Sequence, residues 1–228
     1  SSAGTFNTIF GQPGTVVIDT GADDTSYGPY PLGFTFNYNG TDFTTAGVNA
    51  NGFVAMGASP TSSYTSLSTG TTNNVIAPFN EDLYGLAANG GTMLYQVSGA
   101  PGSQVFTFEW RNWGFWSLGA NELSFQVKLY EGTNVIQFVY QNGTGTAGDP
   151  VQVGLRGSSN AEFNNRTTTT DWSNTTAGAV NSDLCTFSGT VRPANWNPIV
   201  QPYEVFNLSL AYSGIKNLTV TAGIKNLL

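Results

Sequence analysis

Five carboxylates gather in two short segments of this chain, and their chemistry is that of a site for a hard cation. Asp19, Asp23 and Asp24 lie in one acidic turn, and Glu81 and Asp82 are adjacent in a second segment. Calcium binds through several hard oxygens, including carboxylates and loop carbonyls. The spacing is not that of an EF-hand loop. One prediction is therefore a calcium site at Asp19, Asp23 and Asp24, and the alternative is a solvated acidic turn.

The first of these carboxylates also stands in a motif with a catalytic meaning. Val16-Val17-Ile18 leads into Asp19-Thr20-Gly21, and apolar residues followed by Asp-Thr-Gly resemble the signature of the aspartic peptidases. In those enzymes two aspartates share one proton and activate a water. The chain has no second Asp-Thr-Gly or Asp-Ser-Gly, so the resemblance implies a homodimer. The alternative is an acidic turn in which Asp19 caps local amides.

A dense group of aromatic residues is the third candidate site. Trp110, Trp113 and Trp116 follow one another closely, with Arg111 and Asn112 between the first two. We expect the segment from Trp113 to Trp116 to be a loop between two strands. Exposed indoles with adjacent Arg and Asn side chains predict a carbohydrate-binding surface. The alternative is that Trp110 belongs to the core and the other two cover a sheet edge.

The residue types that are missing exclude other chemistry. Histidine is absent and Cys185 is the only cysteine, so the usual general base, the commonest zinc ligand and any internal disulfide are excluded. We interpret Cys185 as a small buried hydrophobe. The net charge of −7 argues against a nucleic-acid partner. No apolar run approaches the roughly 20 residues of a transmembrane helix. Calcium is therefore the one cofactor that the sequence leaves open.

The elements that must position these residues are strands. Apolar and polar residues alternate over 32–38, and Asn39-Gly40 and Asn51-Gly52 follow where two-residue hairpin turns need positive φ. The runs 123–130 and 135–140 alternate in the same way around a Gly-containing turn. With 9% charged and 13% aromatic residues, the pattern predicts an all-β antiparallel sandwich of Greek-key or jelly-roll style over residues 1–200.

Several spaced segments together resemble a known family. They are LGFTF at 32–36, NGF at 51–53, NVIAPFNEDL at 74–83, FTFEW at 106–110, SFQVKLYEGTNVIQFVY at 124–140 and VGLRG at 153–157. In this order they resemble the nidogen-like extracellular β-domain of secreted and surface proteins of Bacteroidetes-type bacteria, over about residues 20–200. The resemblance implies an accessory or adhesive module without catalysis. Asn80-Glu81-Asp82 stands where Trp-Asp-Asp is commoner in that family.

Residues 201–228 follow a different pattern. Two alternating runs flank a turn near Gly214, and their apolar positions are Phe206, Leu208, Leu210, Leu218, Val220 and Ile224. This tail resembles a C-terminal strand hairpin of TonB-dependent outer-membrane receptors, although two strands alone cannot close a barrel. Three interpretations stay open. The hairpin completes the sheet of its own domain, pairs with the edge of another subunit as in donor-strand filaments, or is a receptor-derived fragment.

These patterns lead to one functional prediction with three alternatives. We expect a non-catalytic extracellular cell-surface module for adhesion or assembly, whose partners are other surface proteins, glycans or copies of itself joined through the hairpin. The alternatives are a carbohydrate-binding module, a subunit of a surface filament that polymerises by strand donation, and an aspartic peptidase. Ser1-Ser2-Ala3-Gly4 is typical of a mature end, which predicts export through a cleaved signal peptide.

Overall fold

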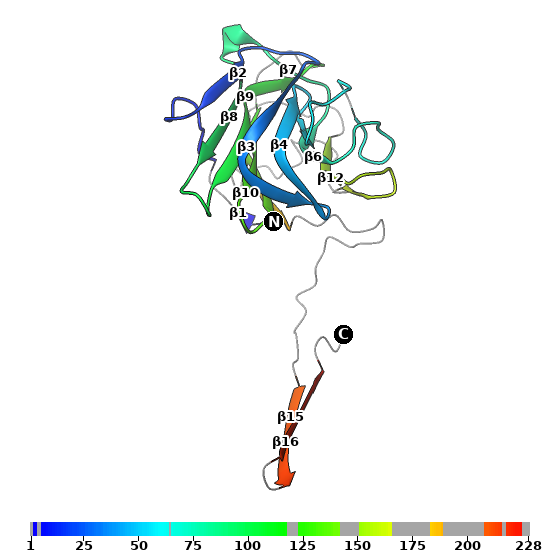
Figure 1. The fold of residues 1–228 in the computed structure, drawn as a ribbon. Helices are drawn as coiled ribbons and strands as arrows, with labels where there is room; N and C mark the ends of the chain where they lie inside the picture. Colours follow the sequence, from blue (N-terminus) through cyan, green and yellow to red (C-terminus); the bar gives the residue numbers. More distant parts are fainter. Residues whose placement is uncertain are drawn as a thin grey trace. The chain divides into compact units, whose positions relative to one another are not determined.

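The chain folds almost entirely into β-strands. A computed structural model describes residues 2–3, 6–63, 65–117, 123–141, 151–165, 183–188, 208–215 and 218–224. It divides the chain into two compact units, Ser1–Trp196 and Asn197–Leu228, which Figure 1 draws. Among the described residues the one helical element is a short 3-10 turn, η1 (Ala87–Asn89), and no helix there is long and apolar enough to cross a membrane. The predicted all-β class is confirmed.

The first unit is a sandwich of two antiparallel sheets. The larger sheet has the spatial order β1 (Ser2–Ala3), β14 (Asp183–Ser188), β11 (Val135–Gln141), β10 (Leu123–Tyr130), β9 (Val105–Phe115), β8 (Thr92–Ser98) and β2 (Val16–Asp19), and β7 (Leu83–Gly85) also pairs with β9. The smaller sheet has the order β13 (Phe163–Asn165), β12 (Gln152–Arg156), β6 (Val75–Asn80), β5 (Phe53–Met56), β4 (Thr41–Asn49) and β3 (Ser26–Tyr38).

Most neighbours in each sheet are also neighbours in the sequence. Strands β3 to β6 form one four-strand meander and strands β8 to β11 form another. Crossing connections of the expected Greek-key kind bring β12 back beside β6 and β14 back beside β11. The chain therefore builds most of one sheet, then most of the other, and closes both with its later strands.

Asn39-Gly40 makes the two-residue hairpin turn that the sequence predicts, whereas the second predicted turn has three residues, 50–52, because Asn49 pairs with Phe53. Asn39 and Gly40 both have positive φ, at 51° and 77°, and the strands they join pair from Tyr38 to Thr41. Gly52, with φ of 75°, turns β4 into β5. A Cβ atom at this position would lie 1.9 Å from the carbonyl oxygen of Phe79. Only glycine fits the turn at position 52, both for its backbone angle and for its close approach to β6.

The core lies between the sheets and is rich in aromatic rings. Phe36 and Tyr38 enter it from the smaller sheet, and Phe108 and Trp110 enter it from the larger one. The Trp110 ring stacks on Phe125 at 4.7 Å between centroids, and its Nε1 donates a hydrogen bond of 3.0 Å to the carbonyl of Asn49 at the end of β4. The indole of Trp110 therefore joins the two sheets as well as filling the space between them.

The described residues of the second unit form a single hairpin. Strands β15 (Leu208–Ile215) and β16 (Leu218–Ile224) pair antiparallel, with Leu208 opposite Ile224 and Tyr212 opposite Val220. The two alternating runs of the tail are thus two paired strands, as the sequence predicts. Phe206, which the sequence analysis also assigns to this hairpin, lies outside the described residues.

Candidate functional site

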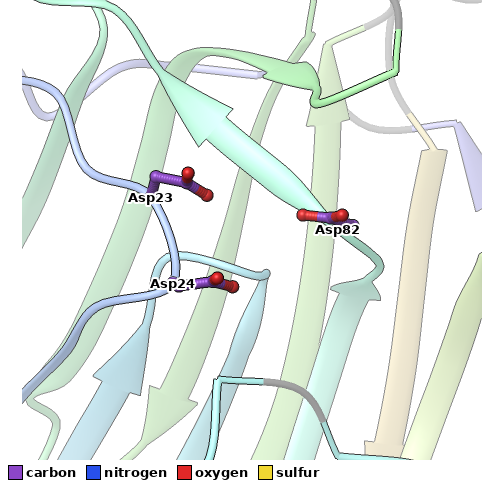
Figure 2. A group of neighbouring side chains, drawn as sticks. All are labelled: Asp23, Asp24 and Asp82. Atoms are coloured by element: carbon purple, nitrogen blue, oxygen red, sulfur yellow. The ribbon is translucent and has the colours of Figure 1, made fainter.

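Three carboxylates from two separate segments meet at one end of the sandwich. Asp23 and Asp24 lie in the turn between β2 and β3, and Asp82 lies in the turn between β6 and β7. Each is exposed, and each offers a carboxylate oxygen that lies within 4.8 Å of those of the other two. Figure 2 shows the three side chains turned toward one another across the two segments. We call Asp23, Asp24 and Asp82 the acidic cluster.

Asn51 holds the two halves of the acidic cluster in place. This side chain is 1% exposed, and its Nδ2 donates hydrogen bonds to Asp24 Oδ1 at 2.9 Å and to the carbonyl of Ser63 at 2.8 Å. Its Oδ1 accepts a bond of 2.8 Å from the backbone N–H of Leu83, the residue after Asp82. The sequence indicates a turn at Asn51-Gly52 but not this second role, because the partners of the side chain come from distant segments.

The three negative charges raise one another's free energy. The pKa of the Asp23 carboxyl lies above its usual range because of partial burial first and then because of the charges of Asp24 and Asp82. A raised pKa means that the folded protein disfavours the ionised form of Asp23. A bound cation would remove this repulsion, and carboxylate oxygens are the ligands that calcium prefers. The donor set of the acidic cluster therefore fits Ca²⁺.

Asp19 lies outside the acidic cluster, and its carboxylate has other partners. The Tyr27 hydroxyl donates a hydrogen bond to it, and the backbone N–H of Thr20 donates another of 2.6 Å. The pKa of Tyr27 rises to about 12, through burial and through this contact with Asp19. Glu81 is not in the group either. The structure thus brings together Asp23, Asp24 and Asp82 from the five predicted carboxylates.

The contacts of the Asp19 carboxylate also bear on the peptidase role predicted for the Asp-Thr-Gly motif. In the described residues the partners of the Asp19 carboxylate are a phenol and a backbone amide, whereas a peptidase dyad requires a second carboxylate that shares a proton. The one bridged residue of this turn, Asp23, pairs with Tyr84 of β7. The arrangement is that of an acidic turn whose first carboxylate caps local groups, and the peptidase homodimer stays a prediction.

The expected tryptophan surface is wrong for Trp113. Strand β9 continues to Phe115, so the segment is not a loop at this point. The Trp113 side chain is fully buried, its Nε1 donates a 2.9 Å hydrogen bond to the carbonyl of Ala50, and its ring covers Gly85, where an added Cβ would lie 2.3 Å from a ring carbon. Trp113 is a core residue and cannot stack on a ligand.

Arg111 and Asn112 both contact the turn at Gly90, and Arg111 also contacts Phe10 in the N-terminal segment. Arg111 Nη1 and Asn112 Nδ2 both approach the carbonyl of Gly90, at 3.1 and 3.3 Å. The Arg111 guanidinium also lies over the ring of Phe10, 4.3 Å from its centroid. These contacts account for both side chains without a ligand.

Trp116 is the exposed member of the tryptophan group. Its side chain is 57% exposed and meets Tyr84 edge to face with 5.5 Å between ring centroids. Its backbone N–H donates a 3.0 Å hydrogen bond to the carbonyl of Asp82. Since Tyr84 is also bridged to Asp23, two connections place Trp116 beside the acidic cluster. One exposed indole and three carboxylates therefore share this end of the sandwich.

Comparison with known proteins confirms the expected resemblance to the nidogen-like domain. A family model described as NIDO related matches residues 1–195. No curated protein and no solved structure matches the chain. The family match covers most of the 228 residues, including both sheets and the acidic cluster. The two-sheet β-sandwich described above, which carries this match over nearly its whole length, belongs to the nidogen-related family of extracellular-type domains.

Proposed function

We propose that this protein is a non-catalytic extracellular module for adhesion or assembly, and that it holds a partner through a calcium ion bound at the acidic cluster. The observation that carries this proposal is the convergence of Asp23, Asp24 and Asp82 from two segments onto one exposed point. Membership of the nidogen-related family supports the extracellular setting. Export through a cleaved signal peptide belongs to the same proposal.

An exposed site leaves the ion open to a partner. Calcium takes about six to eight oxygen ligands, and the three carboxylates provide only part of that number. The remaining positions are available to loop carbonyls, water and the oxygens of a bound molecule. Trp116 is joined to Asp82 by a backbone hydrogen bond, its indole contacts Tyr84, and this exposed indole offers a flat apolar face to a sugar ring. A glycan whose hydroxyls complete the coordination is the partner that this arrangement fits best.

Calcium should stabilise the folded chain, and the acidic cluster should be required for it. At a calcium concentration one hundred times the Kd, we expect about 2.7 kcal/mol of added stability, which corresponds to a rise in Tm of about 5–10 °C for a chain of this size. Asp82→Asn should abolish the rise. Asp42→Asn, which alters an exposed carboxylate of β4 outside the cluster, is the matched control and should retain it. Calorimetric titration with Ca²⁺ measures binding directly, and equal affinities of both variants would contradict the proposal.

The pH dependence of this effect follows from the pKa of Asp23. Because that pKa is raised in the folded state, ionisation of Asp23 destabilises the protein as the pH rises from the ordinary aspartate value through the raised one. Calcium opposes this loss and competes with the protons. The calcium-dependent rise in Tm should therefore be full at neutral pH and decline once Asp23 is protonated. Without calcium, Asp23→Asn should not lower Tm at neutral pH.

Assembly through the C-terminal hairpin is the second part of the proposal. An isolated two-stranded hairpin is marginal in water, and β15 and β16 form a sheet of two strands. We expect the hairpin to gain stability by pairing with another chain. Light scattering of the intact protein should then give a mass above that of one chain of 24.1 kDa, and Leu210→Lys with Val220→Lys should lower that mass by removing the association that the hairpin makes. A monomer before and after the change would mean that the hairpin does not join copies.

A further inference from the structure

The N-terminal segment crosses the outer face of the larger sheet and forms both of its edges. Strand β1 pairs with β14 at one edge, and strand β2 pairs with β8 at the other. The chain between them therefore passes from one side of this sheet to the other. We call residues 6–18 the belt. They are the described part of this crossing, and they end with the last apolar residue of β2.

The face beneath the belt is polar and yet buried. Glu109 of β9 and Gln126 of β10 alternate with core residues, so they point away from the sandwich interior. Glu109 is 1% exposed and Gln126 is fully buried. A carboxylate in this position requires hydrogen-bond donors to offset its loss of water. The belt must therefore supply hydrogen-bond donors to this face as well as covering it.

The belt meets this requirement with a short run of specific contacts. The Thr8 hydroxyl and the Ile9 N–H both donate to the Glu109 carboxylate, the second at 2.8 Å. Gln126 Nε2 donates to the carbonyl of Asn7 at 2.8 Å and to Glu109 Oε2 at 2.6 Å. Farther along, Gln96 Nε2 donates to the carbonyl of Pro13 at 2.9 Å. Side chains of the sheet thus hold the backbone of the belt as they would hold a peptide ligand.

Three successive residues of the belt give this contact its specificity. Thr8 supplies the hydroxyl that reaches Glu109, Ile9 is buried with 7% exposure, and the Phe10 ring lies against the guanidinium of Arg111. The belt itself has no charged residue. The face therefore fits an uncharged segment with the order hydroxyl, aliphatic, aromatic, followed by the turn that Gln12 closes by donating its N–H to the carbonyl of Ile9.

Two observations indicate that the belt can leave this face. Apolar burial holds only a small part of it, since Phe10, Val16 and Val17 remain 46%, 42% and 50% exposed. In addition, Gln126 Oε1 is buried without a hydrogen-bond partner among the described residues, so the belt does not use every polar group of the face. The belt is joined to β3 through the turn that contains Gly21, whose φ is 140°, a conformation that favours glycine.

We propose that the outer face of the larger sheet is a docking face for a peptide segment that turns at Gly11 and Gly14, and that residues 6–18 of a second copy occupy it when two chains exchange their belts. Exchange preserves every contact of the belt, because the second copy offers the same Thr8, Ile9 and Phe10 to the same Glu109 and Arg111. Exchange of an identical element between protomers is a low-cost route to dimers, and here strands β1 and β2 on either side of the belt would move with it and re-form their pairs with β14 and β8 of the second copy. The contacts that carry this inference do not include the acidic cluster, although Asp23 and Asp24 lie in the turn that joins the belt to β3.

A peptide in trans tests the proposal on the intact protein. A fluorescent peptide with the sequence of residues 1–19 is titrated with the full chain in calcium-free buffer, and its anisotropy is measured. We expect binding to the full chain and, when the chain's own belt carries Thr8→Ala and Ile9→Ala, an affinity at least about tenfold higher, since the internal competitor is weakened while the docking face is unchanged. A peptide carrying Thr8→Val and Ile9→Asp should not bind.

A second measurement excludes association through the hairpin and does not depend on the stability of any variant of the docking face. Two differently tagged copies of the full chain, both with Leu210→Lys and Val220→Lys, are incubated together and one tag is captured. Exchange predicts that the second tag is captured too and that excess peptide 1–19 prevents it. Failure of the peptide to bind both the full chain and the belt-weakened chain would overturn the proposal, as would capture that the peptide does not affect.

Discussion

Trp113→Ala is expected to lower the free energy of unfolding by about 3–5 kcal/mol, the usual cost of removing a large aromatic side chain from a core. The ring of Trp113 is fully buried and packs over Gly85, and its Nε1 bonds to the carbonyl of Ala50. The variant therefore loses packing and leaves a buried carbonyl without its donor. Urea unfolding followed by far-ultraviolet circular dichroism measures the loss.

Trp116→Ala is the matched control for this experiment. Its side chain is more than half exposed and rests on Tyr84 at one edge, so we expect a change within about 1 kcal/mol. Equal losses for the two variants would show that Trp113 is not the buried member of the pair. The contrast also decides how binding experiments are read: a loss of glycan binding in Trp113→Ala reports unfolding, whereas in Trp116→Ala it reports a missing contact.

The burial of Trp113 could not be predicted from alternation alone. In a regular strand, Trp110 and Trp113 would point to opposite faces, because they are three positions apart and successive side chains alternate. Strand β9 instead carries an extra residue between its pairings with Phe125 and Leu123, and Asn112 has a φ of 51°. This β-bulge turns Trp113 back toward the core. A bulge depends on the neighbouring strand, so the sequence of β9 gives no sign of it.

The hairpins could be predicted because their signals are local. Asn39-Gly40 carries the positive φ angles of its turn within two residues, and the alternation on either side states which face is buried. The belt is the opposite case. Glu109 alternates with core residues, which predicts an exposed side chain on the outer face, yet Ile9, a hundred residues away, covers it. The alternation of apolar and polar residues does not reveal that a distant segment buries an outward-facing side chain.

The acidic cluster could be predicted in part, unlike the hairpins, which were predictable, and the belt, which was not. Its residue types are evident from the sequence, and they indicate a cation. Which of them converge is decided by the pairing of Asp23 with Tyr84 and by the hydrogen bond that Tyr27 donates to Asp19. The first contact brings Asp23 to the segment of Asp82, and the second keeps Asp19 apart. The residue types thus indicate the chemistry, and tertiary contacts decide which carboxylates meet.

Asn51→Ala should have the second large effect, on stability and on the acidic cluster together. The change removes the donor to Asp24 and Ser63 and the acceptor for the Leu83 N–H, which leaves buried backbone groups unpaired. We expect a loss of about 2–4 kcal/mol and a calcium affinity at least about tenfold weaker, because Asp24 and Asp82 are no longer held together. Urea unfolding and calorimetric titration measure the two effects. Asn37→Ala, which removes an exposed bond to Asp42, is the control.

Asn51→Asp separates the role of Asn51 in holding the turn from its role beside the ion. Aspartate keeps an oxygen that can accept from the Leu83 N–H, but it replaces the donor to Asp24 with a fourth negative charge. Without calcium, this variant should be less stable than the wild type because like charges now lie within hydrogen-bond distance. Calcium should restore more stability to Asn51→Asp than it adds to the wild type, since it offsets a larger repulsion, whereas it should restore little to Asn51→Ala. If calcium stabilises Asn51→Asp and Asn51→Ala equally, the ion does not bind at the acidic cluster. The repulsion between the carboxylates would then only destabilise the turn that joins β2 to β3.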